Sequence, residues 1–193
     1  MQRSPCHCSF SGLQRIAACL GQGILPLDNV LQLGAELQGH LHKMVKCERC
    51  VTSKRAAAML SQLIPRLISF YEAAHLTVAT AEWARPGPTS TQLPGESGRG
   101  VPLVQLVSCE MRLGRLPIDS SEARMLVEVV LVDASLDLNG QLQEWKAAVD
   151  GSMELVQGGS EPVGAVIGHC CDRLAKLIGL LQFGGLSSAQ LHV

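Results

Sequence analysis

Apolar residues recur every three or four positions over most of the chain, which is the spacing of a helix with one buried face. One such row runs from Leu60 to Tyr71, and another runs from Val163 to Leu181. The whole pattern predicts five helices, at approximately 11–20, 27–46, 53–83, 119–149 and 161–183. Five helices of this length predict an all-α fold, a single-domain helical bundle.

Residues at the helix ends support these boundaries. Gly21 and Gly23 follow the first predicted helix, and glycine commonly ends a helix. Asp119 and Glu122 form a capping box at the start of the fourth, with Asp in place of the usual Ser or Thr. Ser160 stands where it can cap the fifth helix. The ends of these helices are therefore predicted along with their apolar faces.

Some residues disturb the predicted helices. Pro65 removes one backbone donor from the third helix and predicts a kink or bend there. Asn139 and Gly140 could break the fourth helix in two. Residues 101–116 are ambiguous, because their apolar run suits a strand but is short.

The middle of the chain lacks the helical pattern. In residues 84–100, eleven of the seventeen positions are Gly, Pro, Ser or Thr, so we expect a mobile linker. The predicted organisation is a flexible segment over 1–10, one helical domain over 11–183 that the linker interrupts, and a tail over 184–193.

The composition agrees with helix packing. Apolar residues make up 47% and aromatic residues only 3%, so the core must be built from aliphatic side chains. No run of 18 apolar residues occurs, and no membrane span is expected. The first residues also lack the apolar core of a signal peptide, so the eight cysteines are expected to be cytosolic or nuclear thiols.

The net charge of −1 argues against nucleic-acid binding as the main task of this chain. The charge is uneven, since residues 1–85 carry nine Lys or Arg and five acids, whereas 86–193 carry seven and twelve. Two ordinary solvated faces explain this asymmetry, and an electrostatic partner surface is the alternative.

Cys47 and Cys50 form a C-x2-C pair, which can supply two thiolates to one tetrahedral zinc ion. The basic residues that follow, Lys54 and Arg55, resemble the start of the fungal binuclear zinc cluster, which binds DNA. That cluster needs a third cysteine seven residues after the second, and this chain has Ala57 there. The chain therefore lacks the zinc cluster.

Other donors could complete a zinc site with Cys47 and Cys50; they are Cys6, His7, Cys8, His40 and His42. In the alternative, the pair occupies a turn between two helices and packs as small apolar groups. We adopt the second interpretation, so neither a metal nor a cofactor is expected. Cys47 and Cys50 are the weak candidates if a metal binds.

The order of these features resembles the carboxy-terminal regulatory domain of fungal zinc-cluster transcription factors of the aflatoxin-regulatory-protein type. The matching elements are a Cys-containing first helix, a long leucine helix, and the C-x2-C before a helix with the sequence Ser-Phe-Tyr-Glu-Ala-Ala at 69–74. Leu-Pro-Ile-Asp at 116–119, an acidic helix start and a final apolar helix follow. The resemblance spans roughly 6–183, and its most specific stretch is 44–74.

The resemblance implies a nuclear, pathway-specific regulator of a fungal secondary-metabolite gene cluster, such as a polyketide cluster. A protein partner or self-association is expected, without direct DNA binding by this chain. The alternative is a stand-alone enzyme or metabolite-binding protein, cytoplasmic, with a small-molecule ligand between the helices. For that alternative, the polar groups that could orient the ligand are His40, Cys47, Tyr71 and Cys109.

Overall fold

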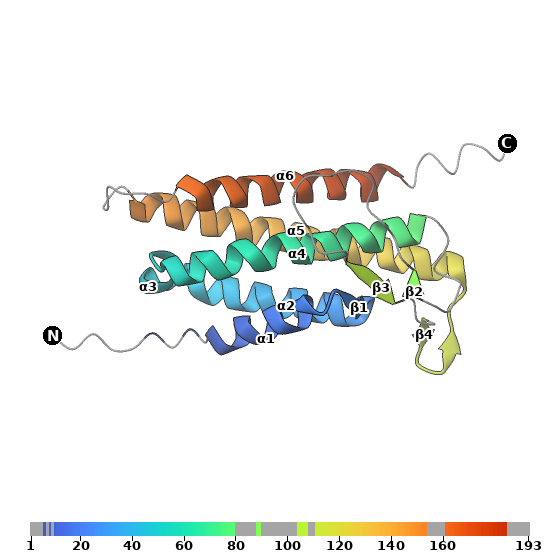
Figure 1. Ribbon diagram of the computed structural model, residues 1–193. Helices are drawn as coiled ribbons and strands as arrows, with labels where there is room; N and C mark the ends of the chain where they lie inside the picture. The colour runs from blue at the N-terminus through green and yellow to red at the C-terminus, as the bar shows by residue number, and fades with distance from the viewer. Residues whose placement is uncertain are drawn as a thin grey trace.

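The computed structural model describes residues 6, 8, 10–79, 88–89, 104–107, 111–153 and 161–184. Within these ranges the chain is a helical bundle, which confirms the predicted all-α class (Figure 1). Its helices are α1 (Phe10–Gly21), α2 (Leu27–Val45), α3 (Glu48–Val51), α4 (Lys54–Ala79), α5 (Ser120–Met153) and α6 (Glu161–Gly184).

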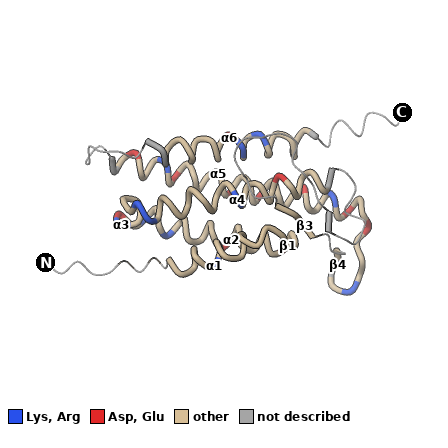
Figure 2. Tube along the Cα trace, viewed as in Figure 1, with Lys and Arg blue, Asp and Glu red and all other residues tan. Residues whose placement is uncertain are grey.

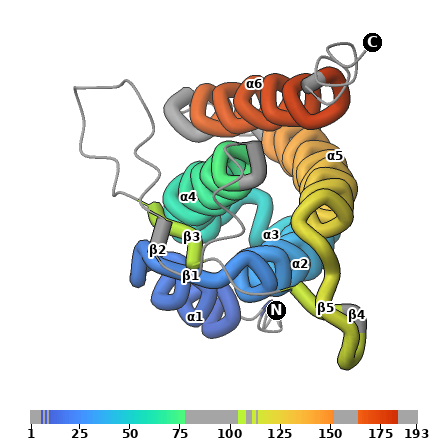
Figure 3. The backbone as a smooth tube through the Cα atoms, turned by 90° about the vertical axis from the view of Figure 1, so that its right-hand side faces the viewer, coloured from blue at the N-terminus to red at the C-terminus, as the bar shows by residue number. Residues whose placement is uncertain are grey.

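The long helices run side by side around one apolar core. Viewed along the bundle, α4 lies between α1 and α2 on one side and α6 on the other, while α5 closes the ring (Figure 3). The largest fully buried side chains include Trp145 of α5 and Phe70 and Tyr71 of α4. The remaining core is aliphatic, as the scarcity of aromatic residues predicts.

Local signals explain three of the helix ends in the described part of the chain. Gly23 follows α1 with a φ of 76°, a conformation that glycine adopts without strain. The Ser53 side chain accepts a hydrogen bond from the Ala56 N–H at the start of α4. Asp119 Oδ1 accepts bonds from the N–H groups of Ser121 (2.8 Å) and Glu122 (2.9 Å) and so caps α5.

Helix α5 departs from prediction in two ways. It continues through Asn139 and Gly140 as one helix of 34 residues, so the predicted break does not occur. Leu126 and Val130 keep the helical spacing of its apolar residues, which predicts burial, but both are exposed. The buried row instead contains Ala123, Val127 and Leu131, because the first half of α5 carries two apolar rows and neighbouring helices cover only one.

The segments between the helices contain short paired strands. β1 (Ile24–Pro26) pairs in parallel with β3 (Gln105–Val107), and β3 pairs antiparallel with β2 (Pro88–Thr89). A second pair, β4 (Arg112–Leu113) and β5 (Leu116–Pro117), forms a hairpin that projects from the bundle. Part of the ambiguous segment is thus extended, with Leu106 buried beneath α4.

Several predictions lie outside the described residues: the end of the third helix at Trp83, most of the 84–100 linker, Cys109, and the tail after Gly184. Among the described helices, none is long and apolar enough to cross a membrane. Helix α4 continues through Pro65 as one helix.

Candidate functional site

Four cysteines from two distant parts of the sequence meet at one end of the bundle. Cys47 is the residue before α3, and Cys50 lies inside this single turn, which connects α2 to α4. The Cys50 N–H donates to the Cys47 carbonyl at 2.8 Å, which folds the C-x2-C pair back on itself. Cys6 and Cys8 precede α1 and pack against the same part of the core.

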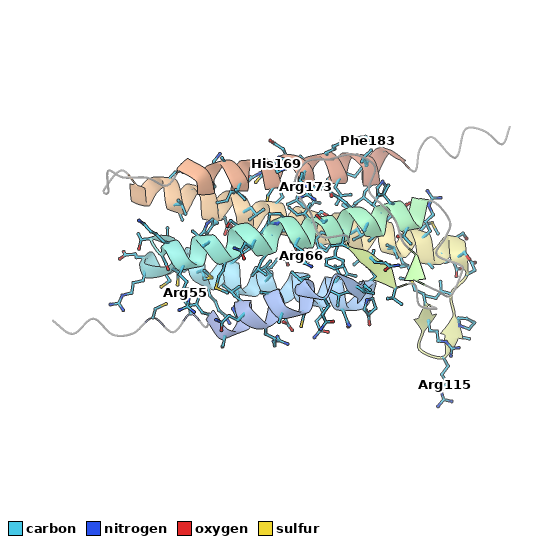
Figure 4. All side chains as sticks on the ribbon, in the orientation of Figure 1. Arg55, Arg66, Arg115, His169, Arg173 and Phe183 are labelled. Carbon is cyan, nitrogen blue, oxygen red and sulfur yellow. The ribbon has the colours of Figure 1, made fainter. Side chains whose placement is uncertain are left out.

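The four sulfur atoms all lie within 4.8 Å of one another. Cys6 Sγ lies 3.4 Å from Cys47 Sγ and 3.3 Å from Cys50 Sγ. Cys50 is buried and the other three are half-buried, so the cluster has one inner and three outer members. Figure 4 shows sulfur atoms at the end of the bundle that carries Arg55.

Hydrogen bonding and burial shift the pKa values of three of these thiols in different directions. The Cys8 N–H donates to Cys6 Sγ at 3.3 Å, and this bond, followed by those from neighbouring thiols, lowers the pKa of Cys6 to about 7. Burial raises the pKa of Cys50 and that of Cys8. Of Cys6, Cys8 and Cys50, Cys6 is therefore the thiol that ionises most readily at neutral pH.

The arrangement is a set of four soft donors around one point. Hydrogen bonds in the cluster join the thiols to each other and to backbone groups, including Cys8 Sγ to the Lys43 carbonyl at 3.9 Å. A nucleophilic cysteine needs a neighbouring base, and the contacts among the described residues do not supply one. The geometry is that of a ligand set for one metal ion and differs from that of a catalytic pair.

The residues proposed for a small-molecule site lie in different surroundings. Cys47 belongs to the sulfur cluster, whereas the imidazole of His40 packs against Gly12 of α1. Tyr71 is fully buried, with its hydroxyl against Gly34 of α2. Cys109 lies outside the described residues. The described members of this group therefore do not line a shared pocket.

The described residues also enclose a small apolar cavity between α4, α5 and α6. Its volume is about 10 Å³, room for about one water molecule, and Trp145 and Cys170 are among its lining residues. Pockets that hold metabolites are typically about 300–1,000 Å³. This cavity does not offer the space that the metabolite-binding alternative needs.

The sequence offers Cys6 and Cys8 as donors but does not by itself select them over the histidines. Their C-x-C spacing was the available signal, because it places two thiols on one short segment. Among the other candidates, His42 is exposed and its Nε2 lies 2.7 Å from Lys46 Nζ, while His7 is outside the described residues.

A second feature lies on the outer face of α5. Met125, Leu126, Val129 and Val130 form an exposed apolar group over two helical turns, which we call the α5 patch. Met125 is 60% and Val129 59% exposed, so these side chains face solvent while the row beside them packs into the bundle. Figure 1 shows that α3 and the beginning of α5 lie at opposite ends of the bundle.

Comparison of the chain with protein-family models, with curated proteins and with solved structures gives no match.

Proposed function

We propose that this chain is a regulatory interaction domain that binds a helical segment of a partner protein on the α5 patch. The observation that carries the proposal is the two-sided apolar pattern of α5. One row of the helix is buried in the bundle, and a second row is exposed to solvent over the same turns. Exposed apolar groups of this kind mark interaction surfaces.

Acidic residues bound the α5 patch at both ends. Glu122 precedes it by one turn, and Asp133 and Asp137 follow it; all three are exposed on the same side of the helix. Arg124 is the one basic residue in positions 120–137, and it pairs with Glu128 at 2.9 Å. The patch thus suits an amphipathic partner helix that carries Lys or Arg on both sides of its apolar face.

The same charges disfavour a second copy of the chain as the occupant. In an antiparallel two-fold pairing of the patch, Met125 would face Val130 of the other copy. Glu122 would then face the other copy's Asp133, and two carboxylates in contact oppose association. We therefore propose a different protein as the partner.

The resemblance to regulatory domains of fungal zinc-cluster factors gives this interaction a setting. The proposal is a nuclear domain of a pathway-specific regulator of secondary metabolism, in which contact with DNA is left to another protein or region. The net charge of −1 supports the assignment of DNA contact to another protein or region. The alternative, a metabolite-binding protein or enzyme, is less well supported because the cavity in the described core holds about one water.

A reporter assay tests the regulatory role. The chain is fused to an unrelated DNA-binding domain, and reporter output is compared for wild type, Val129→Glu and the control Leu180→Glu. Leu180 of α6 is 48% exposed and lies outside the patch, so its variant carries the same new charge elsewhere. We expect Val129→Glu to reduce activation or repression by about tenfold or more and Leu180→Glu to leave it unchanged.

Direct binding completes the test. The probe is a designed helical peptide with a leucine face flanked by lysines, and its matched control has glutamates at those positions. We expect binding of the lysine peptide alone, and loss of that binding in Val129→Glu. Three results would contradict the proposal. The lysine and glutamate peptides could bind equally well, the lysine peptide could bind wild type and Val129→Glu equally well, or the wild-type chain could form a dimer that Val129→Glu dissociates.

A further inference from the structure

We infer that Cys6, Cys8, Cys47 and Cys50 bind one Zn²⁺ ion as a closed structural site. This inference is independent of the proposed partner surface, because the sulfur cluster and the α5 patch lie at opposite ends of the bundle (Figure 1). The ion would tie the segment before α1 to the corner formed by α2, α3 and α4.

The spacing of the sulfur atoms fits a zinc tetrathiolate. With zinc–sulfur bonds of about 2.3 Å, the sulfurs of a regular tetrahedron lie about 3.8 Å apart. Here Cys6 Sγ lies 3.4 Å from Cys47 Sγ and 3.3 Å from Cys50 Sγ, and all four sulfurs lie within 4.8 Å of one another. The tetrahedral spacing of about 3.8 Å lies between the two short distances and the 4.8 Å limit, so the four sulfurs are placed to converge on one centre.

A metal explains the cluster better than disulfide bonds do. Cys6 Sγ lies almost equally far from the sulfurs of Cys47 and Cys50, so no single partner is selected. Both distances exceed the bond length of a disulfide, about 2.05 Å, and all four cysteines are free thiols. Four sulfurs that converge on one point are what a tetrahedral ion requires.

The donor set favours zinc among the common ions. Thiolates select zinc, iron and copper(I), whereas magnesium and calcium take oxygen ligands. Four protein ligands leave no open position for substrate or water, which is the arrangement of structural sites and differs from that of catalytic ones. The ligand pairs, C-x-C and C-x2-C, each approach the ion from one short segment.

The charges near the cluster would stabilise its metal-bound form. Zinc with four thiolates carries a net charge of −2, which nearby cations stabilise. Glu48 is the one acid in residues 43–55, and the same stretch holds five exposed basic residues: Lys43, Lys46, Arg49, Lys54 and Arg55. Figure 2 shows this basic group around α3. In this interpretation the basic residues after the C-x2-C act as counter-charges for the metal centre.

Two further contacts show how the amino-terminal segment would be held. The Cys8 N–H donates to Cys6 Sγ at 3.3 Å, a bond that favours the thiolate form of this ligand. The Arg55 guanidinium lies over the ring of Phe10, with its carbon 5.5 Å from the ring centre. The metal would therefore reinforce an association that packing already begins.

The test is metal binding by the purified, reduced full-length chain. We expect about one equivalent of zinc after expression with zinc, and a visible thiolate–cobalt spectrum when Co²⁺ replaces it. Cys6→Ser and Cys8→Ser should each weaken zinc binding by about a hundredfold or more. The controls are Cys19→Ser and Cys171→Ser, two half-buried cysteines outside the cluster, which should bind zinc as wild type does.

Three results would overturn the inference. The first is wild-type protein with normal helical circular dichroism that binds less than about a tenth of an equivalent of zinc. The second is a Cys6→Ser/Cys8→Ser double variant that keeps wild-type zinc affinity. The third is a cobalt complex without thiolate absorption. These readouts do not depend on the reporter or peptide assays, so failure of the zinc proposal does not contradict the proposed partner binding at the α5 patch.

Discussion

Arg173 of α6 and Glu72 of α4 form a two-pronged ion pair between neighbouring helices. Arg173 Nη2 lies 2.6 Å from Glu72 Oε2, and Nε lies 3.0 Å from Oε1. The same guanidinium donates to Ser69 Oγ at 2.9 Å and to the Pro65 carbonyl at 3.3 Å. The two side chains are 22% and 24% exposed, so this pair is more shielded than an ordinary surface ion pair. Figure 4 shows Arg173 between these helices.

Replacing Arg173 by alanine should destabilise the fold by about 1–3 kcal/mol, because Glu72 would lose both charged hydrogen bonds while still partly shielded from water. Urea unfolding at pH 7 measures the change. The matched control is Arg124→Ala, which removes a pair within α5 and should cost less than about 1 kcal/mol. Equal losses in free energy of unfolding for the two variants would show that Arg173 does not stabilise the packing of α4 against α6.

Gly34→Ala should destabilise the fold by about 1–3 kcal/mol, because a Cβ at this position overlaps the hydroxyl of Tyr71. Tyr71 is fully buried and cannot move aside freely. Gly39→Ala in the same helix is the control: its new methyl would meet nothing within 4 Å, so it should stabilise α2 by about 0.5–1 kcal/mol. Thermal and urea unfolding report the difference, and a stabilised Gly34→Ala protein would refute the close contact.

Tyr71→Phe should rescue part of the Gly34→Ala loss, because it removes the hydroxyl that the new methyl meets. Among the described residues, the Tyr71 hydroxyl has no hydrogen-bond partner, and its burial raises the pKa. Tyr71→Phe by itself should thus be close to neutral in free energy of unfolding. A double-mutant cycle measures the coupling, and strictly additive losses would argue against direct contact.

Asp119 should make the stability of α5 depend on pH. The N–H of Glu122, followed by the Ser121 hydroxyl and N–H, holds the pKa of Asp119 below its ordinary value. A lowered pKa in the folded state means that the cap stabilises above the unfolded-state pKa of about 3.9 and is lost as pH falls through the folded-state value. Melting temperatures at pH 7 and pH 3 should therefore differ less for Asp119→Ala than for wild type. Asp119→Asn should keep part of the cap without this pH dependence.

Chelation should lower the melting temperature of the reduced wild-type chain, since removal of a bound metal withdraws its contribution to folding. The Cys6→Ser/Cys8→Ser variant should melt near the chelated wild-type value and should not respond to chelator. A wild-type melting temperature that is the same with and without chelator would show that zinc does not stabilise this fold.

The helices could be predicted from the sequence because their signals are local. One apolar row and a set of end residues sufficed for α1, α2 and α6, and Asp119 marked the start of α5 correctly. α3 was missed because four residues cannot show a helical period. The parallel pairing of β1 with β3 was missed because strand pairing joins residues far apart in the chain.

The candidate sites show the same limit. The apolar rows of α5 are equally regular, so periodicity alone could not tell that Val127 is buried and Val130 exposed. Likewise, the C-x2-C pair could be recognised in the sequence. That Cys6 and Cys8 join it depends on the tertiary fold, which places the segment before α1 beside the connection between α2 and α4. Spacing identifies donors within one segment, and only the tertiary fold selects which distant donors join them.

The most direct test of the four-cysteine zinc centre is zinc X-ray absorption of the purified, reduced chain. The metal centre predicts a first shell of about four sulfur atoms at about 2.3 Å, with no oxygen or nitrogen ligand. In Cys6→Ser/Cys8→Ser, either the zinc should be absent or its sulfur count should fall by about half. A wild-type spectrum with mainly nitrogen or oxygen ligands, or a protein without zinc, would contradict the four-cysteine centre.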